Sequence, residues 1–145
     1  MSDSTSPGPG QPVNPKRILV ADDEAHMARV IELFLCREGY AVEVVRDGQE
    51  ALESILRQAP DALVTDINMP RMTGKELCLR LQEQLPERGF KIFVMTSMTD
   101  REHRDWSGGM RDTVFIEKPI SLRSLVSRLA RDFADDPAAG SLSDA

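Results

Sequence analysis

Short apolar runs alternate with longer segments of helical periodicity between residues 16 and 134. Most of the short runs are rich in Val, Ile, Phe or Thr and are too short for independent helices, which is typical of strands. Three of them contain few polar positions, as expected of strands covered on both faces. The expected strands are Ile18–Ala21, Ala41–Val45, Ala62–Thr65, Lys91–Thr96 and Thr113–Glu117.

The segments between the strands carry apolar residues at the i, i+3, i+4 spacing of amphipathic helices. The sequence predicts a C-cap region at Gly39, the end of a helix before Pro86, and an N-cap at Ser121. Residues 99–111 fit least well, because a charged run is followed by one tryptophan and two glycines, so a short, frayed or irregular helix is expected. The apolar stripes lie within Met27–Leu35, Ala51–Leu56, Leu77–Leu85 and Leu122–Phe133.

The alternation of strands and helices predicts an α/β fold. Such sequences form right-handed βαβ crossovers and a parallel sheet with helices on both faces, and five units make a complete doubly wound domain. The 145 residues fit one domain. We expect that domain over residues 16–134, after a disordered leader at 1–15 rich in Pro, Gly and Ser and before a flexible tail at 135–145.

Composition and charge exclude several classes of protein. No stretch approaches the ~18 apolar residues of a membrane span, and the N-terminus lacks the pattern of a secretory signal, which favours a cytoplasmic location. Cys36 and Cys78 stand alone, without the spacing of a disulfide framework or a zinc site. A net charge of −6 argues against direct binding to a nucleic-acid backbone.

Polar residues stand at the ends of four of the expected strands. Asp22 and Asp23 follow the first strand, Asp66 follows the third, Thr96 ends the fourth and Lys118 follows the fifth. In an open parallel α/β sheet the ligand site lies outside the carboxyl ends of the strands. We therefore expect these five side chains to converge on one crevice.

Three carboxylates in one crevice need a counter-charge. Two unit charges ~4 Å apart repel by about 4 kcal/mol at an effective dielectric near 20. A divalent cation removes that repulsion, and oxygen ligands without His or Cys favour a hard ion such as Mg²⁺. Lys118 offers a compact positive charge for a phosphoryl oxygen, and Thr96 offers a hydroxyl donor. These are the groups needed for phosphoryl transfer to a carboxylate.

The order and spacing of these residues resemble the receiver domain of two-component response regulators, from roughly Lys16 to Ala134. The resemblance implies a flavodoxin-like fold, with a five-stranded parallel sheet of order 2-1-3-4-5 and helices on both faces. It extends to stand-alone receivers of the chemotaxis-regulator kind. The matching stretches are Ile18–Glu24, Thr65–Pro70 with Gly74, Thr96–Ser97 and Lys118–Ile120.

The resemblance implies roles for the acidic residues. Asp66 is the phosphoacceptor, and its carboxylate attacks a phosphohistidine on a histidine kinase or histidine phosphotransfer protein. Asp23 and Asp66 bind Mg²⁺ directly together with the backbone carbonyl of Asn68, and Asp22 acts mainly through water. The chain is then no enzyme toward external substrates, since its only chemistry is self-phosphorylation and autodephosphorylation.

The resemblance also implies a switch. Lys118 bridges the phosphoryl group, and a cis peptide bond before Pro119 positions it. Thr96 moves toward the phosphoryl group, and Phe115 changes rotamer with it, so that a local charge biases a two-state surface. Phe115 stands where the family often has tyrosine, which excludes a switch that relies on a tyrosine hydroxyl.

Residues 99–111 depart from the family pattern, and two further positions bear on the rate of dephosphorylation. Residues 99–111 lack the usual apolar pattern of the fourth helix, through which receivers commonly signal, so the output surface stays open. Asn68 and Met98 occupy positions that in this family tune the rate of dephosphorylation.

The leading hypothesis is a stand-alone receiver that acts through a downstream protein target or relays the phosphoryl group. It does not bind nucleic acid or membrane itself, and it is a monomer or a weak phosphorylation-dependent dimer. One alternative is a magnesium-dependent phosphohydrolase, which usually needs an acid where Asn68 stands and a cap over its substrate. A second is a pseudo-receiver used only for binding, against which the intact Asp, Thr and Lys set argues.

Overall fold

The computed structural model describes residues 15–97 and 112–134 of the chain. The predictions for the leader apart from Pro15, for residues 99–111 and for the tail at 135–145 therefore lie outside the described residues.

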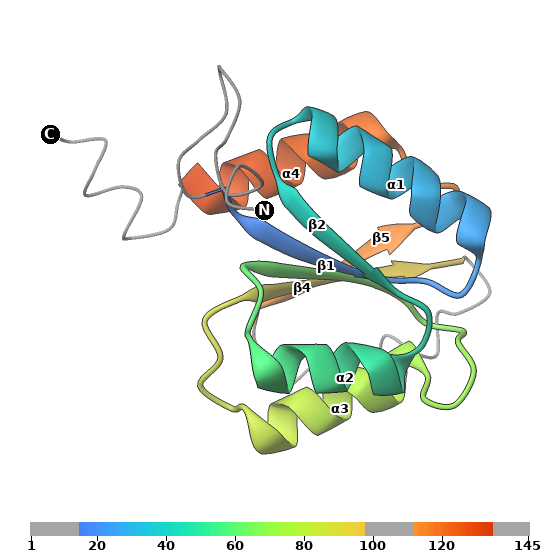
Figure 1. Cartoon of the computed structure of the whole chain (residues 1–145), viewed down its shortest axis with the longest axis vertical. Helices are drawn as coiled ribbons and strands as arrows, with labels where there is room; N and C mark the ends of the chain where they lie inside the picture. The colour runs from blue at the N-terminus through green and yellow to red at the C-terminus, as the bar shows by residue number, and fades with distance from the viewer. Residues whose placement is uncertain (1–14, 98–111, 135–145) are drawn as a thin grey trace, which may run out of the picture.

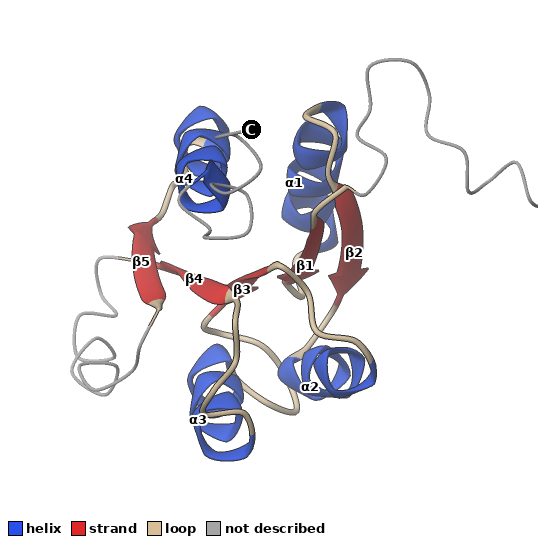
Figure 2. Ribbon diagram, turned by 90° about the vertical axis from the view of Figure 1, so that its left-hand side faces the viewer, coloured by secondary structure: helices blue, strands red, loops and turns tan. Residues whose placement is uncertain are grey.

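The strands form one parallel, five-stranded sheet of order β2-β1-β3-β4-β5 (Figure 2). This order and the parallel pairing confirm the doubly wound, flavodoxin-like fold expected from the sequence. Each strand lies within one residue of its predicted bounds. The strands are β1 Arg17–Ala21, β2 Ala41–Val45, β3 Ala62–Asp66, β4 Lys91–Thr96 and β5 Thr113–Glu117.

Helices cover both faces of the sheet. In Figures 1 and 2, α1 and α4 lie on one face and α2 and α3 on the other. Each helix coincides with one of the predicted apolar stripes, which supplies the residues that face the sheet; only Leu85, the C-cap residue of α3, lies outside its helix. Their bounds are α1 Ala25–Arg37, α2 Gly48–Arg57, α3 Gly74–Gln84 and α4 Leu122–Ala134. None of these four helices has the length and apolar character needed to traverse a bilayer.

The core consists of two apolar layers separated by the sheet. Successive strand residues point to opposite faces, so Leu63 packs in the layer under α2 and α3 while Val64 packs in the layer under α1 and α4. β3 is buried along its whole length. With both faces covered, the polar residues of the central strands gather at their carboxyl ends, where the candidate site lies.

Helix ends follow their capping residues rather than the apolar stripes alone. α2 begins three residues before its predicted stripe, because Asp47 is the N-cap and its side chain accepts a hydrogen bond from the N–H of Glu50. Thr73 and Glu76 form a capping box at the start of α3. The predicted cap of α4 is confirmed, since Ser121 Oγ accepts from the N–H of Ser124 at 3.2 Å.

Candidate functional site

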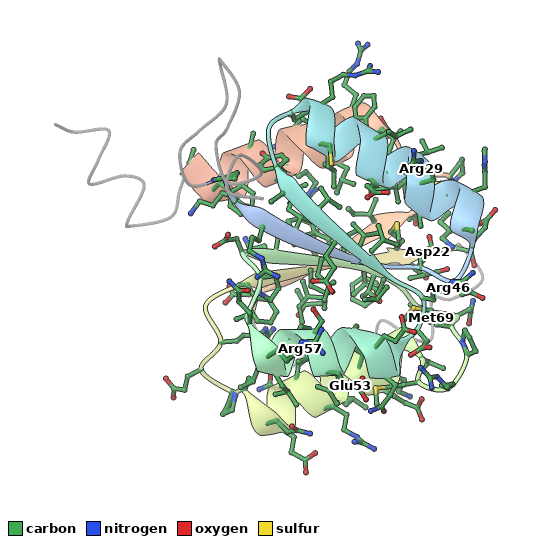
Figure 3. All side chains as sticks on the ribbon, in the orientation of Figure 1. Asp22, Arg29, Arg46, Glu53, Arg57 and Met69 are labelled. Atoms are coloured by element: carbon green, nitrogen blue, oxygen red, sulfur yellow. The ribbon has the colours of Figure 1, made fainter. Side chains whose placement is uncertain are left out.

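Strand register brings the predicted site residues to one edge of the sheet. Ala21 of β1 pairs with Thr65 of β3, so the residues that follow these two in the chain, Asp22 and Asp66, lie side by side. Further along the sheet, Asp66 pairs with Met95, and the residue after Met95 is Thr96. In Figure 3, Asp22 and Met69, from the loop after β3, both lie at the right-hand end of the sheet. The expected convergence is therefore confirmed for these strand ends.

Three carboxylates lie close together at this edge. One oxygen from each of Asp22, Asp23 and Asp66 can be chosen so that all three lie within 4.8 Å of one another. Asp22 and Asp66 are buried, with 1% and 5% of their surfaces exposed, whereas Asp23 is exposed. The cluster therefore combines two carboxylates held in the protein with one that faces solvent.

Among the residues that the structure describes, one cation and one backbone donor hold the Asp66 carboxylate. Lys118 Nζ lies 3.0 Å from Asp66 Oδ1, and the N–H of Ile67 donates to the same oxygen at 2.7 Å. Burial opposes the charge on Lys118, but the hydrogen bond and charge of Asp66 outweigh it and raise the pKa of the ammonium group. Lys118 therefore stays charged and balances part of the acidic cluster.

The backbone around Lys118 is fixed from both sides. Its N–H donates to the carbonyl of Thr96 at 2.7 Å, which ties the end of β5 to the end of β4. The peptide bond between Lys118 and Pro119 is cis, as the resemblance implied. The lysine side chain is 34% exposed, so it is accessible from the crevice.

Asp22 carries an oxygen for which the described residues supply no partner. Its Oδ1 accepts from the N–H of Glu24 at 2.9 Å, whereas its Oδ2 is buried without a hydrogen bond to the described part of the protein. Burial raises the pKa of Asp22, and the nearby Asp66 charge adds to that shift while the Glu24 N–H opposes it. A buried carboxylate oxygen of this kind is costly unless something else binds it.

The donor set fits Mg²⁺. Mg²⁺ prefers oxygen ligands and keeps several waters, so it is bound by one or two carboxylates rather than by a closed protein cage. Asp22, Asp23 and Asp66 supply only oxygen, and the unpartnered Oδ2 of Asp22 is suited to a metal-bound water. These three residues therefore form an acidic cluster that could bind a metal ion.

The acids are not needed to cap the following helix. The N-cap of α1 is Glu24, and its side chain makes no capping hydrogen bond. Helix capping therefore does not account for the Asp22–Asp23 pair, although Asp22 does bind the N–H of Glu24.

The remaining predicted residues that the structure describes differ in burial. Thr96 is fully buried, and its hydroxyl donates to the carbonyl of Ser97 at 3.2 Å. Phe115 is half-buried and packs against the core layer under α2 and α3. Asn68 is exposed in the loop after β3, and Met98 lies outside the described residues.

Sequence reasoning missed a contact beside the site, between the loop after β3 and the start of α2. Arg71 binds Asp47, and Gly48 donates its N–H to the carbonyl of Met72 at 3.0 Å. The Asp47 cap had a sequence signal, since an Asp followed three residues later by Glu50 marks a helix start. Its pairing with Arg71 had none, because the two residues are 24 positions apart.

Replacing Asp22 with asparagine tests the cost of the acidic cluster. Without Mg²⁺, we expect Asp22→Asn to raise the free energy of unfolding by about 1 kcal/mol, because it removes one of several like charges that repel one another. With Mg²⁺ at 100 times its Kd, the wild type should gain about 2.7 kcal/mol, and the variant much less. Urea unfolding with EDTA and with Mg²⁺ measures both. Equal stabilisation of the two proteins by Mg²⁺ would exclude Asp22 from the metal site.

Comparison with known proteins gives consistent matches. The family model of the response regulator receiver domain matches residues 18–130. Response regulator MprA of Mycobacterium leprae (strain TN) is 36% identical over 118 residues, which cover 78% of this chain and 49% of that protein. MprA of Mycobacterium ulcerans (strain Agy99) is 37% identical over 118 residues, which cover 78% of this chain and 48% of that protein.

Solved structures agree with the sequence matches. The chemotaxis response regulator CheY4 of Vibrio cholerae superposes with a TM-score of 0.73 at 28% identity, covering 81% of this chain and 98% of that one. A CheY-like receiver domain protein from Methanospirillum hungatei JF-1 gives a TM-score of 0.77 at 27% identity, covering 85% and 97%. The chain spans about half the length of the curated relatives it matches, so the expectation of a stand-alone receiver stays a prediction.

Proposed function

The chain belongs to the response regulator receiver family of two-component signalling, and from this premise we propose that it accepts a phosphoryl group on Asp66. The donor is a phosphohistidine on a histidine kinase or a histidine phosphotransfer protein. The observation that carries the proposal is the surroundings of Asp66, which has a cation 3.0 Å away and two further carboxylates grouped with it. A carboxylate with a purely structural role needs a nearby cation, but it does not need two further carboxylates beside it.

The proposed metal ligands are Asp23, Asp66 and the backbone carbonyl of Asn68, with Asp22 acting through water. Bound there, Mg²⁺ supplies positive charge to the phosphoryl oxygens and to the clustered acids. The buried, unpartnered Oδ2 of Asp22 supports this assignment.

The proposed reaction is a displacement at phosphorus. A carboxylate oxygen of Asp66 forms a bond to phosphorus as the bond from phosphorus to the histidine nitrogen breaks, and that nitrogen keeps the electron pair. Lys118, already within hydrogen-bond distance of Asp66, stabilises the negative charge on the phosphoryl oxygens. Hydrolysis of the resulting acyl phosphate by water regenerates Asp66. The protein is thus a stoichiometric acceptor rather than an enzyme toward an external substrate.

The proposed output is a change of surface recognised by a protein target in the cytoplasm. The Thr96 hydroxyl is bonded to the carbonyl of Ser97, and its movement toward the phosphoryl group breaks that contact. Phe115 packs against a core layer without being fully buried, so it has a route to a second rotamer. The two residues lie on neighbouring strands, where Thr96 pairs with Glu117 of β5.

Intact-mass measurement tests the proposal. The protein is incubated with Mg²⁺ and a small phosphodonor such as acetyl phosphate, and separately with EDTA. A Mg²⁺-dependent gain of one phosphoryl group that maps to the peptide containing Asp66 supports it. No gain with any donor, including phosphohistidine proteins, would favour a pseudo-receiver, and turnover of external phosphate esters would favour a phosphohydrolase.

Replacing Lys118 with alanine should separate metal binding from phosphoryl transfer. Loss of one hydrogen-bond donor to a developing anion typically costs about 10²–10³-fold in rate, so phosphorylation of Lys118→Ala should slow by at least that order. Mg²⁺ should bind more tightly, because the cation that competes for Asp66 is gone. Calorimetry and rapid-quench mass measurement follow the two effects. Lys91→Ala is the control, since it breaks an ion pair of 3.2 Å with Asp132 at the opposite end of β4. A parallel fall of both quantities in Lys118→Ala would contradict this role.

A further inference from the structure

Arg71 occupies a strained turn in the loop that follows the phosphoacceptor strand. Its φ is 64°, and the N–H of Met72 donates to the carbonyl of Pro70 at 2.6 Å, which closes a three-residue turn around Arg71. A turn of this hand is rare and strained for a residue with a side chain, whereas glycine adopts it readily. The arginine side chain makes an interaction that can offset this strain.

That interaction is an ion pair with the N-cap of α2. Arg71 Nε and Nη2 lie 3.0 Å and 2.9 Å from Asp47 Oδ2, while Asp47 Oδ1 accepts the N–H of Glu50 at 2.9 Å. Burial opposes the charge on Asp47, but the Glu50 N–H and Arg71 outweigh it and lower its pKa. Beside the pair, Gly48 donates to the carbonyl of Met72 at 3.0 Å. One carboxylate thus serves both the helix and the loop.

The other end of the loop holds the phosphoacceptor. The N–H of Ile67 donates to Asp66 Oδ1 at 2.7 Å, and the carbonyl of Ile67 accepts from the N–H of Gly74 at 2.7 Å. Asn68, whose carbonyl is a proposed metal ligand, is the next residue. The loop is thus closed at its base beside Asp66 and fastened to α2 through Arg71.

We propose that Arg71 is a positioning residue, which through Asp47 holds the loop in the conformation that presents Asp66 and the Asn68 carbonyl to Mg²⁺. This inference rests on the proposed function, because it concerns the same metal site. Strain in the turn is then part of the site, offset by the ion pair. Groups that orient metal ligands from outside typically change metal affinity by about 10–100-fold.

Positioning and simple electrostatics predict opposite signs when Arg71 is removed. Loss of a cation near an acidic cluster strengthens Mg²⁺ binding if charge alone matters. Loss of a positioning residue weakens Mg²⁺ binding. The Arg71 side chain is 60% exposed, so salt screens the pair and the measurement belongs at low ionic strength.

The test is calorimetric Mg²⁺ binding to Arg71→Gln, which keeps a long polar side chain at the φ of 64° but removes the charge that binds Asp47. We expect Mg²⁺ affinity to fall on the order of 10-fold, while urea unfolding in EDTA shows a folded protein of near wild-type stability. Asp47→Ser keeps an N-cap for α2 and should lower the affinity equally. Both substitutions break the same ion pair between Arg71 and Asp47. The double variant should therefore bind Mg²⁺ no more weakly than either single variant.

Arg80→Ala is the matched control, since Arg80 is an exposed arginine of α3 beside the same groove as Arg71. It should leave Mg²⁺ affinity unchanged or slightly stronger. If Arg71→Gln binds Mg²⁺ as tightly as the wild type or more tightly, this inference is wrong but the proposed function still stands. A wild-type protein that neither binds Mg²⁺ nor takes up a phosphoryl group would instead overturn the proposed function.

Discussion

Asp66→Asn is expected to lower the rate of phosphoryl incorporation by on the order of 10⁴-fold or more, the range that loss of a nucleophile costs. The amide still accepts the Ile67 N–H, now 2.7 Å from Asp66 Oδ1, so the geometry of the strand end should persist. What it loses is the negative charge that makes the carboxylate oxygen a nucleophile toward phosphorus, together with the ion pair with Lys118. Intact-mass measurement over time with Mg²⁺ and acetyl phosphate gives the rate.

Asp61→Asn is the control for this prediction. Asp61 precedes β3 at the other end of the same strand, where its Oδ2 accepts the N–H of Arg17 at 2.7 Å. Like Asp66→Asn, this substitution removes one negative charge, but it leaves the acidic cluster intact. Phosphoryl labelling should therefore continue at the wild-type rate. Labelling of Asp66→Asn at that rate would mean that another residue accepts the phosphoryl group.

Gly74→Ala is expected to lower the free energy of unfolding by about 2 kcal/mol or more. A Cβ built at Gly74 would lie 2.1 Å from the carbonyl oxygen of Asp66 and 2.9 Å from Cα of Ile67. Both neighbours are backbone atoms, so β3 and the start of α3 must separate, and overpacking of this kind costs about 1–3 kcal/mol or more. The usual advantage of alanine over glycine in a helix, about 1 kcal/mol at most, does not offset it.

Urea unfolding measures this loss, and Gly89→Ala serves as the comparison. No atom lies within 4 Å of a Cβ built at Gly89, so alanine there should be neutral or stabilise by up to about 1 kcal/mol. Because Gly74 contacts Asp66 itself, the alanine variant should also show weaker Mg²⁺ binding if it folds. Equal stabilities for the two variants would mean that β3 and α3 can separate without cost.

The acidic cluster links stability to function in this protein. Asp22, Asp23 and Asp66 repel one another when no metal is bound, and Lys118 is the cation seen to contact them among the described residues. The same repulsion provides the driving force for Mg²⁺ binding under the proposed function. Substitutions that relieve it, such as Asp22→Asn, are therefore expected to stabilise the metal-free protein while weakening the metal site.

The periodicity of apolar residues predicted most of the secondary structure. Each strand and helix that packs in the two-layer core must place apolar residues at the spacing that faces the core. Ala41–Val45 and Lys91–Thr96 were predicted with the bounds that the structure shows. The start of α2 at Gly48 lies three residues before its predicted apolar stripe, which begins at Ala51. Its first turn is polar and is set by the Asp47 cap, so an apolar stripe gives no signal there.

The sequence by itself determined which residues reach the candidate site. In a parallel doubly wound sheet, every strand end lies on one edge, so Asp22, Asp66 and Lys118 had to meet once the strands were identified. Tertiary structure alone decided how they are held: the burial of Asp22 with an unpartnered oxygen, the lysine contact of 3.0 Å, and the link from Arg71 to Asp47. Those features depend on distances between residues far apart in the chain, which periodicity along the sequence does not encode.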